Sequence, residues 1–407
     1  MSTSALRIGL VYTGGRGWIG GEHYIANILN ALKLYNAKAL GRISYQVILC
    51  FTNSEDEPHI RKVFADADGY QLLEIQSSSL RRRDVIISSL NLYIPRRLRL
   101  FKPRTQQRWL SIDNIDVLYP FDFSVPISAN TTALGWIPDF QPRLLPVYFS
   151  ENELKTRTAI DDRIVNSATD IVFSSQDSLQ RFLEFYPNSR ARPHLFHFHP
   201  FIAKDVFSFD CKSMQTKYSL PDKYFICCNQ FWQHKNHVII FEALKLLMTS
   251  QPEVFVVFTG HTQDSRLPSY FDDLCAMINK LGIRTNIAIL GLIPRHDQVQ
   301  LIRQSIGIIQ PSLSEGWSSV VEDSRALGKK IILSDLAVHQ EQDPPGAIYF
   351  DRTSADSLKK SMQRAWLNWS EGPDPNAEKR AEDLSTELIL IMAESFLNIV
   401  KQVAPKK

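Results

Sequence analysis

Short runs of apolar residues, many of them β-branched, alternate with helical patterns along the whole chain. Several of these runs are apolar at consecutive positions, which is typical of strands buried on both faces of a parallel sheet. The first half contains candidate strands at Arg7–Thr13, Tyr45–Thr52, Gln71–Gln76, Asp116–Tyr119, Thr132–Ile137 and Asp170–Ser174. The second half contains candidate strands at Tyr224–Cys228, Val254–Thr259, Ile287–Leu290, Ile306–Gln310, Lys330–Ser334 and Ile348–Phe350.

Helical periodicity fills the intervals between these strands, as in the apolar stripe of Ile25, Ile28, Leu29 and Leu32. Strand–helix alternation in two blocks predicts an α/β protein with two Rossmann-like domains, each a doubly wound parallel sheet. The segment between Pro200 and Pro221 lacks periodicity and joins the blocks. We therefore expect an N-terminal domain over residues 1–205, a C-terminal domain over 206–376 and a final helical segment over 377–407.

Charge and cysteine content narrow the class of protein. A formal net charge of only +3 over 407 residues gives no strong field that would attract nucleic acid. The five scattered cysteines form no CxxC pair, which indicates reduced thiols and a cytoplasmic location. The first residues do not read as a signal peptide, and no apolar stretch approaches the roughly 18 residues of a membrane span. We expect a cytoplasmic protein, soluble or peripheral on the inner face of the membrane.

The segment Gln310–Gly328 carries the strongest chemical signal. A strand is expected to end near Gln310, a loop with Glu315 and Gly316 follows, and a helix is expected to begin near Ser318. Ligands of open α/β sheets bind at the carboxyl ends of strands, and the N–H groups at a helix start suit a phosphate. The segment therefore predicts a site for a phosphorylated ligand.

Helical geometry separates the two adjacent acids of this segment. At about 100° per residue, Glu322 lies nearly opposite the apolar face formed by Val320, Val321 and Leu327. Asp323 lies on the flank of that face, beside the crevice. We therefore expect Glu322 to be a solvated surface acid and Asp323 to reach a ligand.

The spacing Glu315-x7-Asp323 resembles the Glu-x7-Glu motif of the retaining GT-B glycosyltransferases, group 1, family four. The resemblance implies that Glu315 contacts the donor sugar and that Asp323, shorter than the usual Glu, holds the ribose hydroxyls. It continues through Ser334–Glu341. It also implies a GT-B fold of two domains facing across a cleft, with a final helix that returns to the N-terminal domain.

A second part of the resemblance follows the first strand of the C-terminal half. There the family carries a basic pair that neutralises the donor diphosphate. Lys235 matches its lysine, whereas Gln230 stands where an arginine is usual. A lysine at a helix start also opposes the helix dipole unless an anion is close, which favours a role in ligand binding over a solvent-exposed one.

The N-terminal half begins with a glycine-rich loop. Gly15, Gly17 and Gly20 form a literal GxGxxG, which is typical of a dinucleotide site, but the acid expected after the second strand is replaced by Phe51–Asn53. The loop also resembles the family's glycine-rich loop, which would place Gly20 and Gly21 near the donor phosphate and the acceptor. We favour that interpretation over a nicotinamide cofactor.

Further candidates lie between the two motifs. Asp139 and Arg143 follow a strand and are cleft candidates, with a structural turn as the alternative; Pro138 stands where many relatives carry a His. The segment His194–His199 contains three histidines, for which packed or solvated positions are more plausible than a metal site. A belt of basic and apolar residues suits an anionic membrane surface or a lipid-linked acceptor, or is a solvated basic face; it includes Arg81, Arg82, Arg83, Arg96 and Arg97.

These observations predict a retaining glycosyltransferase that moves a hexosyl group from a nucleoside-diphosphate sugar to a glycan or lipid-linked acceptor, with no cofactor and no metal. The alternatives are a catalytically silent GT-B partner subunit and, less favoured, an NAD(P)-dependent oxidoreductase. Glu315 and Asp139 are the expected catalytic residues. The residues expected at the donor are Gly20, Gly21, Gln230, Lys235, Gly316, Ser318, Ser319, Val320 and Asp323. Arg143 is expected on the acceptor side, with the basic belt.

Overall fold

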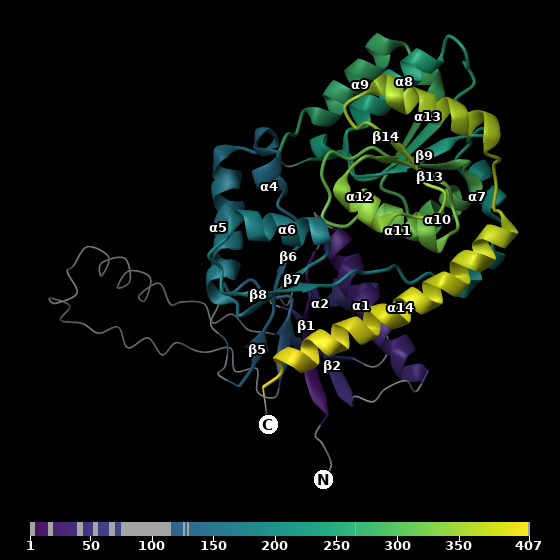
Figure 1. Cartoon of the computed structure of the whole chain (residues 1–407). Coiled ribbons are helices and arrows are strands. Elements are labelled where there is room, and N and C mark those ends of the chain that lie inside the picture. The colour runs from purple at the N-terminus through teal and green to yellow at the C-terminus, as the bar shows by residue number, and fades with distance from the viewer. Residues whose placement is uncertain are drawn as a thin grey trace.

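A computed structural model describes residues 5–14, 19–38, 44–51, 56–64, 70–74, 115–124, 127, 130–264 and 266–405. Within these residues the chain forms two α/β domains built on parallel sheets, shown one above the other in Figure 1. This arrangement confirms the predicted fold class.

The N-terminal domain contains two parallel sheets. The first has the order β3-β2-β1-β4-β5 and the second the order β6-β7-β8. Their strands are β1 (Leu6–Val11), β2 (Tyr45–Phe51), β3 (Tyr70–Glu74), β4 (Val117–Tyr119), β5 (Thr132–Ala133), β6 (Gly135–Ile137), β7 (Asp170–Phe173) and β8 (Arg192–Leu195). The helices are α1 (Ile19–Ala37), α2 (Glu57–Val63), α4 (Gln141–Leu144), α5 (Glu151–Ser167) and α6 (Gln176–Phe185).

Two details of this domain differ from the sequence prediction. The expected strand Thr132–Ile137 is divided at Leu134, so that β5 and β6 belong to different sheets. Strand β8 was not predicted, because its sequence Arg-Pro-His-Leu is neither apolar nor alternating. It pairs only with β7, and a proline is tolerated in such an edge strand.

The C-terminal domain contains a single parallel sheet with the order β11-β10-β9-β12-β13-β14. Its strands are β9 (Phe225–Cys228), β10 (Val256–Thr259), β11 (Ile287–Gly291), β12 (Gly307–Gln310), β13 (Ile331–Ser334) and β14 (Ile348–Phe350). Its helices are α7 (Cys211–Lys217), α8 (His237–Leu247), α9 (Tyr270–Leu281), α10 (Arg295–Gln304), α11 (Ser319–Ala326), α12 (Ala337–Gln342) and α13 (Ala355–Asn368). Most of these strands are buried along their whole length, which explains why apolar runs located them.

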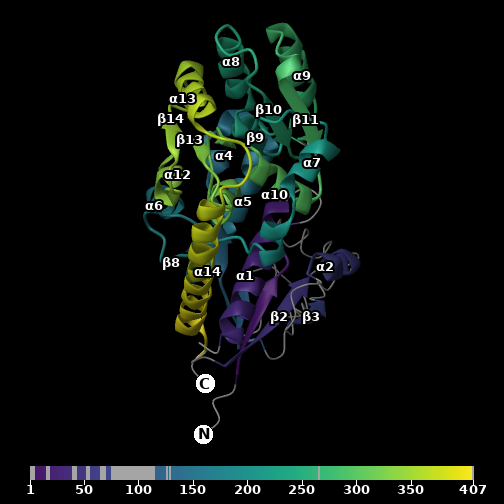
Figure 2. The ribbon, with the colours of Figure 1, turned by 90° about the vertical axis from the view of Figure 1, so that its right-hand side faces the viewer.

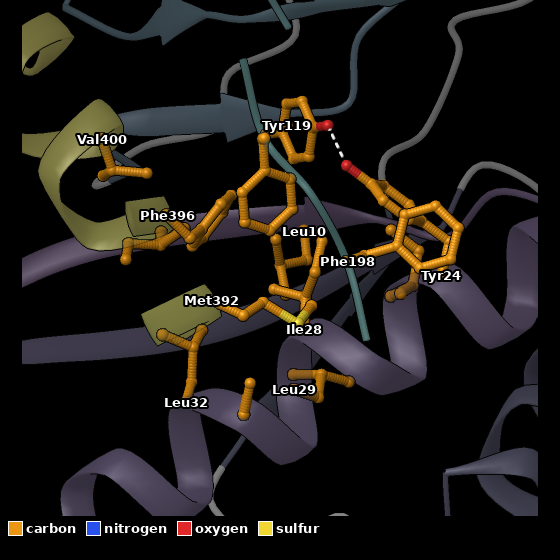
Figure 3. Packing of buried hydrophobic residues seen from close by; sticks show 14 of the residues in the cluster. Leu10, Tyr24, Ile28, Leu29, Leu32, Tyr119, Phe198, Met392, Phe396 and Val400 are labelled. Atoms are coloured by element: carbon orange, nitrogen blue, oxygen red, sulfur yellow. Dashed lines mark hydrogen bonds between the residues drawn. The ribbon is translucent and has the colours of Figure 1, made fainter. Parts of the chain in front are cut away.

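The last helix, α14 (Pro375–Val403), leaves the C-terminal domain and runs along the N-terminal domain beside α1 (Figures 1 and 2). Met392, Phe396 and Val400 of α14 belong to the same buried cluster as Ile28 and Leu32 of α1 (Figure 3). The final helix therefore completes the N-terminal core and covalently ties the two domains a second time. Among the described helices, none is long and apolar enough to cross a membrane.

Candidate active site

The strand order of the C-terminal sheet creates a topological switch point between β9 and β12. From β9 the chain proceeds outward to β10 and β11, and from β12 it proceeds to β13 and β14 on the other side. Beyond the carboxyl ends of these neighbouring strands, Asn229 Nδ2 donates to Gln310 Oε1 over 2.8 Å. Open α/β sheets bind ligands in the crevice at such a point. The loops after β9 and β12 carry Lys235 and Glu315 to it.

Glu315 is buried in the loop after β12, and one of its carboxylate oxygens receives all of its hydrogen bonds. Oε1 accepts from Lys235 Nζ at 2.5 Å, Ser312 Oγ at 2.6 Å and Gln310 Nε2 at 2.9 Å. Burial alone would raise the pKa of Glu315, but the Lys235 charge and these bonds hold it below its ordinary value. Oε2 accepts no hydrogen bond from any residue the structure describes. The site thus presents an ionised carboxylate with one oxygen left for a ligand.

Lys235 and Gln230 lie on the loop between β9 and α8. The Lys235 side chain is 15% exposed and pairs with Glu315, and the loops are tied further by a hydrogen bond from Leu313 N to His234 O. The Gln230 Oε1 atom is buried and has no hydrogen-bond partner among the described residues. Sequence reasoning therefore located both residues at one crevice, with charge contributed only by Lys235.

Helix α11 begins at the same crevice. Ser318 occupies its N-cap position, and the Ser318 N–H donates a hydrogen bond to Gln342 Oε1 at 3.1 Å. The N–H groups of Ser319 and Val320 belong to the first turn and have no intrahelical acceptor. The positive end of the helix dipole therefore lies beside Glu315 and Lys235.

Gly316 packs directly against the backbone of the N-terminal domain. A Cβ built on Gly316 would lie 1.9 Å from the Pro138 carbonyl oxygen and 3.1 Å from the Asp139 Cβ. A larger residue could be accommodated only if one of these segments shifted. The requirement for glycine here is a matter of space between domains, which the sequence did not reveal.

The expectation for Glu322 is wrong. Its side chain is fully buried, and both of its oxygens are used. Oε2 is hydrogen-bonded to His199 Nδ1 at 2.7 Å and accepts from Arg325 Nε at 3.3 Å. Oε1 accepts from Gln342 Nε2 at 2.9 Å. Glu322 does point away from the apolar face that packs on the sheet. The opposite face of α11, however, is covered by the inter-domain segment with His199 and by α12 with Gln342, so it is not exposed to solvent.

Asp323 lies on the flank of α11, as expected, and is buried against a cation that sequence reasoning missed. Arg295 Nη2 and Nη1 donate to Asp323 Oδ1 at 2.5 Å and Oδ2 at 2.8 Å. Arg295 begins α10 directly after Pro294. A basic residue at a helix start is the same signal that singled out Lys235, and it would have found Arg295.

The start of α1 faces this part of the crevice. Gly20 and Gly21 lie in its first turn. Burial lowers the pKa of His23, Arg295 lowers it further and Asp323 opposes the change, so the first turns of α1 lie close to the pair on α10 and α11. The other two glycines of the GxGxxG, Gly15 and Gly17, lie outside the described residues.

Asp139 faces Glu315 from the N-terminal domain. Its Oδ1 accepts from Gln141 N at 3.0 Å, which fixes the turn into α4. Burial raises the pKa of Asp139, the Gln141 bond opposes the rise and the Glu315 charge adds to it. Two carboxyl groups from opposite domains thus approach each other, one with a raised and one with a lowered pKa, which suits different chemical roles.

Arg143 was expected in the cleft, but its guanidinium is held within the N-terminal domain. It donates to the Tyr186 hydroxyl at 2.6 Å and to Asp162 at 3.2 Å, and lies over the Phe185 and Tyr186 rings. These contacts favour the structural alternative. The basic-belt candidates Arg81, Arg82, Arg83, Arg96 and Arg97 lie outside the described residues.

The three histidines near the domain junction pair with three different carboxylates. His194 contacts Asp170 at 2.7 Å and His197 contacts Glu341 at 2.9 Å, while His199 contacts Glu322. Over the described part of the chain, no group of three His, Cys, Asp or Glu residues is arranged to hold a metal ion. Glu341 also accepts from the Gln176 and Asp177 N–H groups at the start of α6, so it links the domains.

Comparison with known proteins finds a family that matches most of the C-terminal domain. Residues 212–382, which include Lys235, Glu315, Asp323 and Arg295 of the crevice, match the family described as Glycosyl transferases group 1. No curated protein sequence matches the chain significantly.

Solved structures of glycosyltransferases are similar over nearly the whole chain. A glycosyltransferase from Rickettsia africae is 15% identical, with a TM-score of 0.62, covering 98% of this chain and 99% of that chain. HepE from Anabaena, solved with UDP and glucose, is 12% identical, with a TM-score of 0.63 and coverage of 98% and 100%. Sucrose-phosphate synthase from Thermosynechococcus elongatus is 14% identical, with a TM-score of 0.62 and coverage of 98% of each chain. The chain therefore has the GT-B fold, and its residues 212–382 carry the signature of the group 1 glycosyl transferases.

Proposed function

We propose that this protein is a glycosyltransferase that moves a hexosyl group from a nucleoside-diphosphate sugar to a glycan or lipid-linked acceptor. One observation carries the proposal: the ionised Glu315, with one oxygen unused, meets Lys235 and the start of α11 at the switch point of the C-terminal sheet. The complex of HepE with UDP and glucose supports the choice of donor class.

The donor chemistry follows from where the charges lie. Departure of a nucleoside diphosphate requires stabilisation of the negative charge that develops on it. Lys235 and the N–H groups of Ser319 and Val320 supply this stabilisation, so we propose a reaction without a metal. Glu315 Oε2 accepts a hydrogen bond from a hydroxyl group of the donor sugar, and Asp323 orients the ribose.

The acceptor approaches from the N-terminal domain. Asp139, whose pKa is raised, lies next to Gly316 at the contact between the domains, close to Glu315, and is our candidate for the group that handles the acceptor proton. Gly20 and Gly21 border the same space. We propose retention at the anomeric carbon on the basis of the Glu315-x7-Asp323 motif alone.

The first test is a thermal-shift screen with UDP-, GDP-, ADP- and TDP-sugars. Ligand that binds only the folded state stabilises it by mass action, so the true donor raises the Tm above the other three. Sugar transfer with that donor, followed by NMR of the product anomer, tests activity and stereochemistry. A protein that no nucleotide sugar stabilises would contradict the proposal.

A silent partner subunit is the second candidate, because Gln230 adds no cation and Lys235 already pairs with Glu315. That function would give nucleoside-diphosphate binding without hydrolysis or transfer to any acceptor.

We also propose a cytoplasmic location with peripheral membrane contact through the basic belt. Salt-sensitive flotation with anionic liposomes tests it. The proposal fails if an Arg81/Arg82/Arg83 to Ala variant floats as well as the wild type.

A further inference from the structure

Arg295 is held in a fixed orientation at the carboxyl edge of the C-terminal sheet. Besides its two bonds to Asp323, its Nη1 donates to Gln298 Oε1 at 2.8 Å. Gln298 Nε2 in turn donates to Thr259 Oγ1 at the end of β10, at 3.0 Å. A guanidinium anchored on two sides loses little rotational freedom when it binds a further ligand.

The guanidinium has hydrogen-bonding capacity to spare. An arginine carries five N–H donors. The contacts above, which are those within the described part of the chain, use three of them, leaving Nε–H and one Nη2–H. The Arg295 side chain is 35% exposed, whereas Asp323 beneath it is 6% exposed. The ion pair is therefore more accessible at the arginine than at the carboxylate.

Lys235 and Arg295 lie on opposite sides of the end of β9. Cys227 and Cys228 are successive residues of β9 and belong to the cores on opposite faces of the sheet. Lys235 lies just before α8, whose Ile240 shares a core with Cys227. Arg295 begins α10, whose Leu301 shares a core with Cys228. The two cations therefore lie at the starts of helices that cover opposite faces of the sheet, on either side of the strand that ends at the switch point.

We propose that Arg295 binds the donor diphosphate from the side of β9 opposite Lys235, so that the diphosphate lies across the strand end between the two cations. The proposal rests on the proposed function, because it assigns a residue to the same donor. Two N–H groups on one edge of a guanidinium match two oxygens of a phosphate, and Asp323, which binds the Nη1 and Nη2 end, leaves the Nε/Nη2 edge unoccupied.

The test compares binding of a nucleoside diphosphate with binding of its nucleoside. Of UDP, GDP, ADP and TDP, the one that most stabilises the wild type is titrated by calorimetry, together with the matching nucleoside. The variants are Asp323→Asn and Asp323→Asn/Arg295→Gln. The second leaves no unpaired buried charge, so it remains folded, and comparison with the first isolates the Arg295 cation. Arg284→Gln, an exposed arginine of the same domain, is the matched control.

Loss of a charge-assisted bond predicts that the double variant binds the diphosphate roughly 10- to 100-fold more weakly than Asp323→Asn. Nucleoside affinity should be equal in the two variants, and the salt dependence of diphosphate binding should be weaker in the double variant. Equal diphosphate affinity of the two variants, or a parallel loss for the nucleoside, overturns the proposal while the proposed function stands. A wild type that binds no diphosphate overturns both.

Discussion

Two buried glutamates at the ends of the same short segment invite comparison. Glu315 lies in the crevice, and Glu322 lies at the domain junction with His199, Arg325 and Gln342. Both carboxylates are nearly inaccessible to solvent, both contact a cationic side chain, and both have a lowered pKa because those contacts outweigh burial. Burial, pairing and pKa therefore do not distinguish them.

The distribution of hydrogen bonds does distinguish them. Both oxygens of Glu322 are used by partners within the protein, whereas within the described ranges every bond to Glu315 goes to Oε1. Glu322 is fully buried and all three of its bonds lie within the domain junction, so this carboxylate holds a structure together. One with an unused oxygen at a crevice can still bind a ligand. The comparison assigns Glu322 to stability and Glu315 to chemistry, and each assignment can be tested separately.

The largest effect on stability is expected from Glu322→Ala. Removal of one partner from a buried network leaves the Arg325 charge without its counter-charge and His199 without its carboxylate partner, and should lower the free energy of unfolding by about 3 kcal/mol. Urea denaturation measures this, and Glu387→Ala on the exposed side of α14 is the control. Donor affinity below the unfolding transition should not change. If donor binding is lost while stability is kept, the assignment of Glu322 is wrong.

Glu315→Gln should have the opposite profile. The amide keeps the shape of the side chain but loses the charge, and we expect kcat to fall by about 100-fold, as when a positioned electrostatic group is removed. The amide oxygen can still accept from Lys235 and Ser312, so the free energy of unfolding should fall by less than in Glu322→Ala, although Lys235 loses its counter-charge. Initial rates of sugar transfer and urea denaturation of the same preparation provide both measurements. Full activity combined with a large loss of stability would make Glu315 another junction residue.

Gly316→Ala tests the contact between the two domains at the crevice. The added methyl would meet the Pro138 carbonyl oxygen, so one side of the contact must shift, at a cost of about 1–3 kcal/mol typical of overpacking. We expect a larger radius of gyration by small-angle X-ray scattering and reduced transfer, with each domain still folded. Gly282→Ala is the control: its Cβ would meet no atom within 4 Å, but its φ of +67° is unfavourable for alanine, so it should lower stability without changing the radius or the transfer rate. An unchanged radius and activity would show that this contact is not needed.

The smallest effect is a change in the pH dependence of stability in Glu322→Gln. A carboxyl group with a folded pKa below its unfolded value stabilises the protein above the unfolded pKa. That contribution disappears as the pH falls through the folded value. The deficit of Glu322→Gln relative to wild type should therefore be largest at neutral pH and should shrink below about pH 4.3, the ordinary value for Glu. Denaturation curves at neutral and acidic pH measure it, and a deficit that grows on acidification would contradict the assignment.

Sequence reasoning located the elements well because burial on both faces is a local property. All but one of the predicted strands appear as single strands, and Thr132–Ile137 appears as two. It also located Lys235 and Glu315, which the structure brings into contact although their positions differ by 80 residues. Both residues were found from a family resemblance in their own segments. Hydrophobic periodicity could not have shown that Lys235 and Glu315 meet, because it describes only neighbouring positions.

What the sequence prediction got wrong or missed shares one physical cause. Glu322 is paired with His199, whose position differs by 123 residues, and Asp323 with Arg295, whose position differs by 28. Arg143 is held by Tyr186, whose position differs by 43. A helical wheel gives the angle of a side chain about its own axis but not what covers that angle. For an interface between domains, the covering residues come from elsewhere in the chain.

By itself the sequence determined the α/β alternation, the strand ends and the loop that presents Glu315, because composition and local geometry set each of them. Only the tertiary structure decided which of two adjacent acids closes the domain junction, which cation accompanies Asp323 and why Gly316 must lack a side chain. Those features depend on the packing of one domain against another. That packing is fixed by contacts between residues far apart in the chain. Local sequence patterns contain no information about such contacts.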